Sequence, residues 1–328
     1  MTEQDVVVRV ADSDIFKRWH WFSYHFNLLL KGNEPFLAGP IISACLECET
    51  AIPGFADEFI SAIASICGRE KHLPHYEQLL QRLAELFVIR QLVRFPWPTP
   101  RSFRWEPTAG TSKKNPEICV EYLNTTVGFE VKAPSLIEHI NKRSTRPLQI
   151  PSRSDALPAL IGEHSKDEVT LPRDNPVKDF LISANEKFAE FKKSDPRFIG
   201  ILVIVWDDFI YEPISSLLDP GAGLFTPKSF AKKADGSTIC FENVDGVVII
   251  RYLHQIIRAT REHPLIDGFL TLFDYGTPGS FPFKAFVQNP NCSNVPAVVL
   301  ESLQAEIPSP ILGAEYVPSN LVWWTNHE

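Results

Sequence analysis

The pattern of hydrophobic and polar positions divides the chain into a helical first part and a strand-rich second part. Up to about residue 95, apolar residues recur at spacings of three and four, most regularly over 75–93, where Leu79, Leu83 and Phe87 mark one stripe. This spacing is typical of an amphipathic helix. Further helices are expected over 14–31, 40–50 and 55–67.

Beyond the prolines at positions 96, 98 and 100, which stop the long helix, the period of the pattern changes from 3.6 to 2. Alternating and continuously apolar runs predict strands, and an Asn-Pro pair at 175–176 predicts the start of another helix. Strands separated by helices indicate an α/β fold with a central mixed sheet flanked by helices. The expected strands are 103–106, 117–123, 126–132, 199–206 and 244–251, and later helices are expected over 175–193 and 253–261.

Changes in this pattern suggest three parts. Residues 1–75 form an N-terminal helical region, and residues 76–262 form an α/β core. The core contains a polar, proline-rich insertion around 136–175, and residues 263–328 form a C-terminal extension with short apolar runs. A chain of 328 residues is long enough to bury a full core without disulfides.

The two alternating strands carry the candidate chemistry, because side chains on a strand point to opposite faces in turn. One face is apolar, and the other holds Glu117, Glu130 and Lys132. A two-residue turn at Asn124-Thr125 would pair positions whose numbers sum to 249, which places Glu117 opposite Lys132 and Cys119 opposite Glu130. Glu117 and Glu130 then become diagonal neighbours, with Cα atoms on the order of 7 Å apart.

Two carboxylates at that separation can hold one Mg²⁺ or Mn²⁺ ion. Lys132 would orient or help deprotonate an attacking water, or stabilise the charge on a phosphate under attack. A Glu-x-Lys word alone is common, and Glu190 and Lys192 form a second copy on a predicted helix. The alternative for Glu130 and Lys132 is an ordinary cross-strand ion pair on a solvated face.

The runs RLAELFVIRQLV and KKNPEICVEYLNTTVGFEVKAPS resemble the PD-(D/E)XK nuclease superfamily, over roughly residues 77–206. That superfamily places an acid on a helix, an acid after a proline at the start of a strand, and Glu-x-Lys on the next strand. The resemblance assigns these positions to Glu85, Glu117, Glu130 and Lys132. The superfamily usually has Asp where this chain has Glu117, so Glu121 could share its role, and Glu77 is the alternative acid on the helix.

The resemblance implies a restriction-endonuclease-like core and a metal-dependent phosphodiesterase that acts on DNA, with duplex DNA as the expected substrate. It suggests a role in prokaryotic restriction or anti-phage defence, alone or with a partner protein of such a system. Cutting both strands of a duplex needs two sites, so a homodimer is expected. Two alternatives stay open: a nucleic-acid-binding or assembly module without catalysis on the same fold, and a nuclease directed at RNA.

The charge balance changes this interpretation only locally. The chain has 32 Lys and Arg against 40 Asp and Glu, a formal net charge of −8, which argues against a protein that coats nucleic acid. Residues 101–153 nevertheless hold nine bases against five acids, as a rim that binds phosphates would. The candidate nucleic-acid contacts are Lys113, Lys114, Lys142, Arg143, Arg146, Gln149 and Arg153, with Lys187 on the later helix.

Other features add little chemistry. Cys45 and Cys48, with Cys67, His72 and His75, have the count for a zinc site, but buried structural cysteines are the preferred interpretation. The acidic pair at 207–208 is expected to begin a loop rather than to bind metal. No run of 18 apolar residues and no basic, then apolar, leader is present, and the six cysteines suit a reducing compartment, so a cytoplasmic protein is expected.

Overall fold

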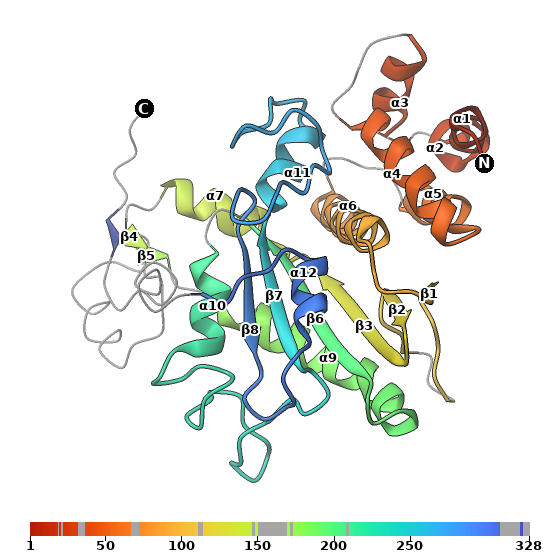
Figure 1. The fold of residues 1–328 in the computed structure, drawn as a ribbon. Helices are drawn as coiled ribbons and strands as arrows, with labels where there is room; N and C mark the ends of the chain where they lie inside the picture. Colours follow the sequence, from red (N-terminus) through yellow and green to blue (C-terminus); the bar gives the residue numbers. More distant parts are fainter. Residues whose placement is uncertain are drawn as a thin grey trace.

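Helices surround a six-stranded sheet in the structure, which is a computed structural model (Figure 1). It describes residues 1–18, 20, 22–31, 37–66, 72–110, 114–145, 148–149, 169–170, 173–207, 210–308 and 322–323. Within these residues, no helix combines the length and the apolar character that crossing a membrane requires.

A layer of helices precedes the sheet, and its apolar stripes face inward. The long helix α6 (Leu73–Arg94) buries the stripe predicted from the sequence, and α4 packs against it. The one helix expected over 14–31 is two helices, and α1 at the N-terminus was not predicted. The other helices of the layer are α1 (Glu3–Asp12), α2 (Asp14–Lys17), α3 (Phe22–Leu30), α4 (Ala38–Ala51) and α5 (Phe55–Ser65).

The sheet confirms the α/β class and its mixed character. Its strands run in the order β1-β2-β3-β6-β7-β8, and β3, β6 and β7 are parallel while the remaining neighbours are antiparallel. β8 lies in the segment expected to be a C-terminal extension, yet it is hydrogen-bonded to β7. The strands are β1 (Arg101–Trp105), β2 (Ile118–Tyr122), β3 (Thr125–Lys132), β6 (Ile199–Trp206), β7 (Gly246–Arg251) and β8 (Lys284–Gln288).

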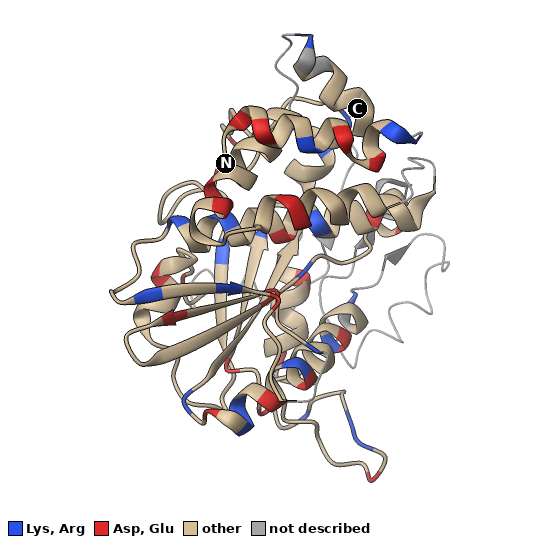
Figure 2. Cartoon of the chain, turned by 90° about the vertical axis from the view of Figure 1, so that its right-hand side faces the viewer, with Lys and Arg blue, Asp and Glu red and all other residues tan. Residues whose placement is uncertain are grey.

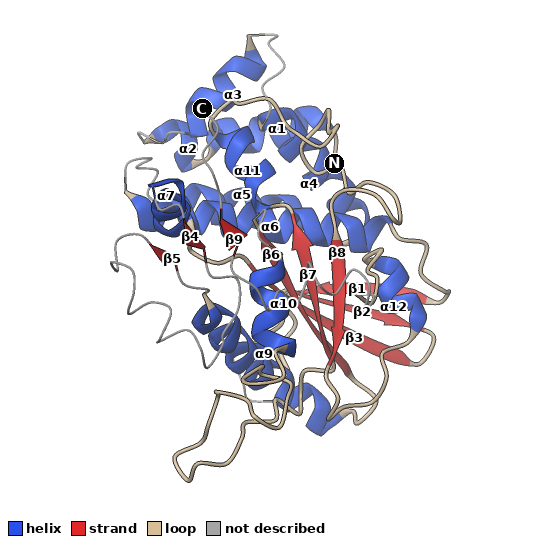
Figure 3. Ribbon diagram, turned by 90° about the vertical axis from the view of Figure 1, so that its left-hand side faces the viewer, coloured by secondary structure: helices blue, strands red, loops and turns tan. Residues whose placement is uncertain are grey.

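Helices α9 (Asp174–Ser194) and α10 (Tyr211–Leu218) pack on one face of the sheet, as Figure 3 shows. On the other face, Trp97, which follows α6, packs its ring against Phe129 of β3. A second, small sheet has the strand order β5-β4-β9. The remaining elements are α7 (Ile137–Thr145), β4 (Leu148–Gln149), β5 (Val169–Thr170), α11 (Leu253–Thr260), α12 (Ala297–Ser302) and β9 (Val322–Trp323).

The expected register of the β2–β3 hairpin is wrong by two residues. Paired positions sum to 247, so that Cys119 lies opposite Gly128 rather than opposite Glu130. The turn falls one residue earlier than expected because Leu123 adopts a left-handed backbone, with φ of 50°. A shift of two leaves every side chain on its predicted face. Continued by one pair, the register places Glu117 opposite Glu130 rather than Lys132.

Two glycines let α9 approach the sheet closely. A Cβ atom on Gly128 of β3 or on Gly200 of β6 would collide with the rings of Phe188 or Phe198. Phe188 belongs to α9, so its ring can lie against the backbone of both strands because the glycines have no side chains. This contact lets α9 lie directly on β3 and β6. Polar side chains of α9 can therefore reach the side chains of β3 that share a face with Gly128.

Candidate active site

Glu130 lies at the centre of a cluster of charged side chains on the face of the sheet that α9 covers. The Glu130 side chain has no exposed surface, and the Nζ atom of Lys132 lies 2.6 Å from its Oε1 atom. Alternation along β3 places both side chains on the same face, as the pattern predicted. Glu130 and Lys132 are therefore not a solvated cross-strand pair, because both lie on β3 and Glu130 is fully buried. A fully buried carboxylate is costly without partners, and Lys132 is one such partner.

Lys187 of α9 brings a second ammonium group to Glu130. Its Nζ atom lies 2.7 and 2.8 Å from the two carboxylate oxygens of Glu130, and 3.6 Å from Oε1 of Glu117. The sequence suggested Lys187 only as a phosphate contact on the polar side of a helix. The structure instead places its ammonium group between two buried carboxylates, which the helical pattern alone could not indicate.

Glu117 immediately precedes β2 and is almost fully buried. Its backbone carbonyl accepts a hydrogen bond of 2.9 Å from the amide of Glu106, which continues the β1–β2 pairing. Burial, followed by repulsion from Glu85 and Glu130, raises the pKa of Glu117 to about 8 despite the nearby ammonium groups of Lys187 and Lys132. Part of the Glu117 population is therefore protonated at neutral pH.

Helix α6 contributes Glu85 at the end of β3. Arg82 donates to Oε2 of Glu85 at 2.7 Å, and Gln81 donates to its Oε1 at 2.8 Å. Burial raises the pKa of Glu85 although Arg82 and Gln81 stabilise the carboxylate. Glu77, the alternative acid two turns earlier, forms no hydrogen bond or ion pair with these groups.

Gln81 is a site residue that sequence reasoning missed. Its amide nitrogen also donates to the backbone carbonyl of Val131 at 3.0 Å, and its amide oxygen accepts from the backbone amide of Ala133 at 2.6 Å. These two peptide groups flank Lys132, so Gln81 joins α6 to the strand end that carries the lysine. Its position could have indicated this role, because a residue one helical turn before Glu85 lies on the same face of the helix.

Lys132 remains a protonated amine in this environment. Burial disfavours its charged form, but the carboxylates of Glu130, Glu117 and Glu85 outweigh burial and raise the pKa of Lys132. An ammonium group cannot accept a proton from water. It can donate hydrogen bonds to an anionic oxygen.

The other predicted residues lie elsewhere. Glu121 binds Arg104 and Ser102 on β1 instead of sharing the role of Glu117. Exposed Lys114 pairs with Glu186 on α9. Lys113, Arg146 and Arg153 lie outside the described residues, and the side chains of Lys142, Arg143 and Gln149 are not described. Figure 2 shows basic and acidic residues interspersed over the helices and the sheet in the described part of the chain.

A cleft of about 560 Å³ opens beside the cluster, on the side of Glu85. It lies between the end of α5 and the first half of α6, and the residues after β3 close it. Gln81, Arg82 and Glu85 line it, as do Glu77 and Gln78 one to two turns earlier on α6. Glu85 is the acid of the cluster that lines this cleft, whereas Glu117 and Glu130 do not line it.

The described residues show no ready-made group of three His, Cys, Asp or Glu side chains for a metal ion. In the cluster, Lys187 bridges Glu117 and Glu130, and Arg82 and Gln81 hold Glu85. The two cysteines considered for zinc, Cys45 and Cys48, are buried in α4, and Cys67 is outside the described residues. Burial raises the pKa of both thiols well above the ordinary value, which disfavours the thiolate that zinc requires.

Comparisons with protein family models, with curated proteins and with solved structures find no match to this chain. Its class is therefore set by its own architecture: an α/β protein with a six-stranded mixed sheet. Within this architecture, α6, the β2–β3 hairpin and α9 form a buried cluster of carboxylates and ammonium groups.

Proposed function

We propose that this chain is a metal-dependent phosphodiesterase that cleaves DNA. The observation that carries the proposal is the convergence of Glu85, Glu117 and Glu130 with Lys132 in one buried cluster beside an open cleft. Buried carboxylates that repel one another cost stability, and such groups with shifted pKa values concentrate at functional sites. A purely structural role would be served better by apolar side chains.

The arrangement of elements supports the resemblance to the PD-(D/E)XK superfamily. A helix with an acid, a strand preceded by an acid and a strand ending in Glu-x-Lys occur in this order as α6, β2 and β3, with β1 between α6 and β2. After α7, β4 and β5, helix α9 and strand β6 complete the unit, and β6 pairs in parallel with β3. A restriction-endonuclease-like core is thus the fold that we propose for α6 through β6.

Glu117 and Glu130 are the residues that would hold Mg²⁺ or Mn²⁺, with Glu85 available at the edge of the cluster. Their fit rests on donor chemistry, because carboxylate oxygens are the preferred ligands of hard divalent cations. A single cationic group, the ammonium of Lys187, already bridges both carboxylates. When bound, such a metal supplies Lewis acidity and lowers the pKa of water.

Lys132 stabilises negative charge in this proposal and does not act as a base. Its raised pKa keeps the amine protonated at neutral pH, and its position 2.6 Å from Glu130 keeps it beside the proposed metal ligands. An ammonium group held there donates a hydrogen bond to a phosphate oxygen as charge develops on it. Gln81 fixes the peptide groups on both sides of Lys132 and so fixes the backbone position from which the amine extends.

The test is cleavage of duplex DNA, single-stranded DNA and RNA by the purified chain with Mg²⁺, with Mn²⁺ or with EDTA. We expect metal-dependent cutting of duplex DNA, and a loss of at least about 100-fold in rate in Glu130→Gln and in Lys132→Met. Glu121→Gln is the matched control, because it removes an acid of the same hairpin that pairs with β1 instead.

Cutting that persists in EDTA, or an equal loss in Glu121→Gln, would contradict the proposal. Preference for RNA in the same panel would move the substrate to the RNA-directed alternative. Restriction or defence, a partner protein of such a system and a homodimer stay predictions from the resemblance.

A second candidate is a nucleic-acid-binding or assembly module without catalysis. One observation favours it: the chain itself supplies three cations, Arg82, Lys132 and Lys187, to the three acids of the cluster. Unchanged binding of nucleic acid by Glu130→Gln and Lys132→Met, without cutting by the unmodified chain, would support this module.

A further inference from the structure

We infer that Lys187 is a built-in counter-ion that a divalent cation must displace from Glu117 and Glu130. This inference rests on the metal site of the proposed function and adds how that site is regulated. One lysine on α9 would keep the two carboxylates together in the metal-free protein, and its departure would accompany loading.

The position of the Lys187 ammonium group is the first argument for displacement. Nζ of Lys187 contacts both oxygens of Glu130 and lies 3.6 Å from Glu117, which leaves it between two carboxylates. A divalent cation held by the same two groups requires oxygens of both. The ammonium group and the metal therefore compete for one place, because two cations cannot share it without strong repulsion.

Glu130 has another cationic partner besides Lys187, which is the second argument. Lys132 occupies one side of this carboxylate at 2.6 Å, so Glu130 does not depend on Lys187 alone for compensation of its charge. Glu117 has no second ammonium contact of this kind among the described ion pairs. Lys187 can thus leave while Lys132 stays, and the metal then replaces the charge that Lys187 withdrew.

The partial exposure of the Lys187 side chain is the third argument. Its side chain keeps 19% of its surface exposed, whereas Glu130 has none, so the amine has a route toward solvent. A flexible lysine stem swings without moving the helix. After displacement the ammonium group remains beside the cluster, where it can contact a phosphate of the substrate.

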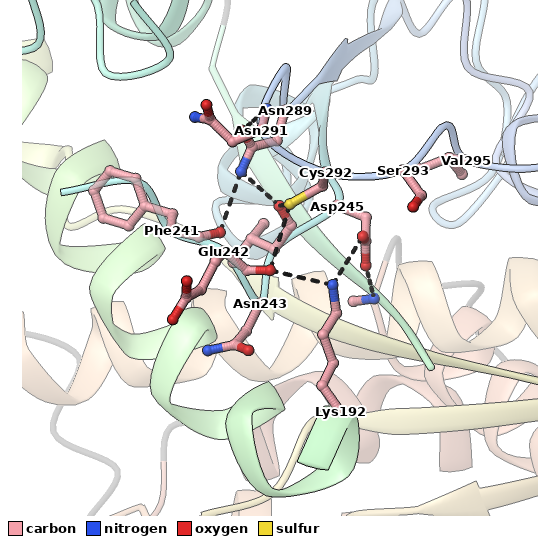
Figure 4. A network of polar contacts seen from close by, with 12 residues as sticks. Lys192, Phe241, Glu242, Asn243, Asp245, Asn289, Asn291, Cys292, Ser293 and Val295 are labelled. Carbon is pink, nitrogen blue, oxygen red and sulfur yellow. Dashed lines mark hydrogen bonds and ion pairs between the residues drawn. The ribbon is translucent and has the colours of Figure 1, made fainter. Parts of the chain in front are cut away.

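The same helix provides a matched control. Lys192 lies on α9 five residues beyond Lys187, its side chain is also 19% exposed, and it pairs with Asp245 at 2.8 Å. Figure 4 shows the network around Asp245, in which Lys192 also reaches the backbone carbonyl of Glu242. Asp245 also accepts a hydrogen bond from the backbone amide of Gly200. Lys192 thus has a similar ion pair away from the proposed metal ligands.

Calorimetric titration of the full chain with Mn²⁺, without nucleic acid, tests the competition. We expect Lys187→Met to bind Mn²⁺ about tenfold more tightly than the unmodified chain, because the competing cation is gone. Lys192→Met should bind with unchanged affinity. Because removing Lys187 could impair folding, circular dichroism of both variants accompanies the titration.

A second measurement uses the unmodified protein. Acylation of lysines by acetic anhydride, read by mass spectrometry, should label Lys187 several-fold faster at saturating Mn²⁺ than in EDTA, because displacement exposes its amine. Labelling of Lys192 should not change. This readout keeps the inference testable if Lys187→Met does not fold.

The outcomes separate the two proposals. Mn²⁺ binding that is equal or weaker in Lys187→Met, or labelling of Lys187 that Mn²⁺ does not change, overturns the inference and leaves the proposed phosphodiesterase intact. Tighter binding in Lys187→Met with no cleavage of any nucleic acid supports the inference and overturns the proposed function. No binding of Mn²⁺ to either protein overturns both.

Discussion

At the scale of single residues, the cluster is a place where the protein gives up stability. Glu117 is the clearest case, because burial and two neighbouring carboxylates raise its pKa to about 8. An acid whose pKa is higher in the folded than in the unfolded state makes the folded state less stable once the pH exceeds the unfolded pKa. The unfolded value for Glu is about 4.3. The cost grows as the pH rises and is complete above about 8.

The first prediction is that Glu117→Gln stabilises the metal-free protein at high pH. Gln carries no charge, so the variant avoids the cost of ionising a buried acid. In EDTA we expect its free energy of unfolding to exceed that of the unmodified chain by on the order of 1–3 kcal/mol at pH 9, and the gain to shrink toward pH 4. Urea unfolding at several pH values measures the free energy of unfolding of the variant and of the unmodified chain.

Glu121→Gln serves as the control, since it removes an acid of the same hairpin that is partly exposed and paired with Arg104. Its effect should be within about 0.5 kcal/mol at both pH values. A gain in Glu117→Gln that does not vary with pH would show that the shape of the side chain, and not its charge, is responsible.

At the scale of elements, α6 links the helical layer to the strand that carries Lys132. Gln81 contacts the backbone at Val131 of β3 and at Ala133 just after it, and Arg82 reaches Glu106 after β1 at 3.7 Å while it holds Glu85. One turn of α6 thereby contacts two other segments of the chain, the end of β3 and the residues after β1. The position of α6 along its own axis is consequently set by polar contacts as well as by its apolar stripe.

The second prediction concerns this link. Gln81→Met keeps the length of the side chain but removes the hydrogen bonds that Gln81 makes with the Val131 carbonyl of β3 and with the Ala133 amide just after it. We expect a loss of about 2 kcal/mol in stability and faster hydrogen exchange at the Ala133 amide. In the proposed enzyme, cleavage should fall as well.

Gln78→Met is the comparison for this variant, because Gln78 lies one turn earlier on α6 and its side chain is exposed. It should change neither stability nor exchange. Unaltered exchange at Ala133 in Gln81→Met would mean that other contacts hold the end of β3.

The same elements show how far the sequence could predict this protein. Alternation along 126–132 placed Glu130 and Lys132 on one face, and that placement survived a hairpin register wrong by two residues, because only an odd shift exchanges faces. The register itself depends on a left-handed Leu123, which no turn rule favours. Lys187 and Gln81 were not placed because their contacts depend on how closely α9 and α6 approach β3.

At the scale of the whole molecule, the sheet joins segments that are far apart in the sequence. β8 comes from the proline-rich segment that had no predictable periodicity, and it forms the edge beside β7. Phe286 of β8 is buried over Gly246. The segment after residue 262 is therefore needed to cover β7, whose own residues are almost entirely apolar.

The third prediction is that Phe286→Ala costs about 3–5 kcal/mol of stability, the range found when a buried phenylalanine is truncated. Phe283→Ala, on the same segment but 42% exposed, should cost less than half as much. Denaturant unfolding followed by tryptophan fluorescence measures both changes. Equal costs would show that β8 is only loosely attached to the sheet.

The matching of charges in the cluster has a consequence for how a nucleic acid arrives. Three bases face three acids there, and the partial protonation of Glu117 leaves at most a small net positive charge, whereas the whole chain carries −8. A DNA molecule therefore meets net repulsion before it touches the protein. Adding salt at low ionic strength should speed the first encounter by screening that repulsion, the opposite of its usual effect on proteins that attract DNA with an excess of positive charge.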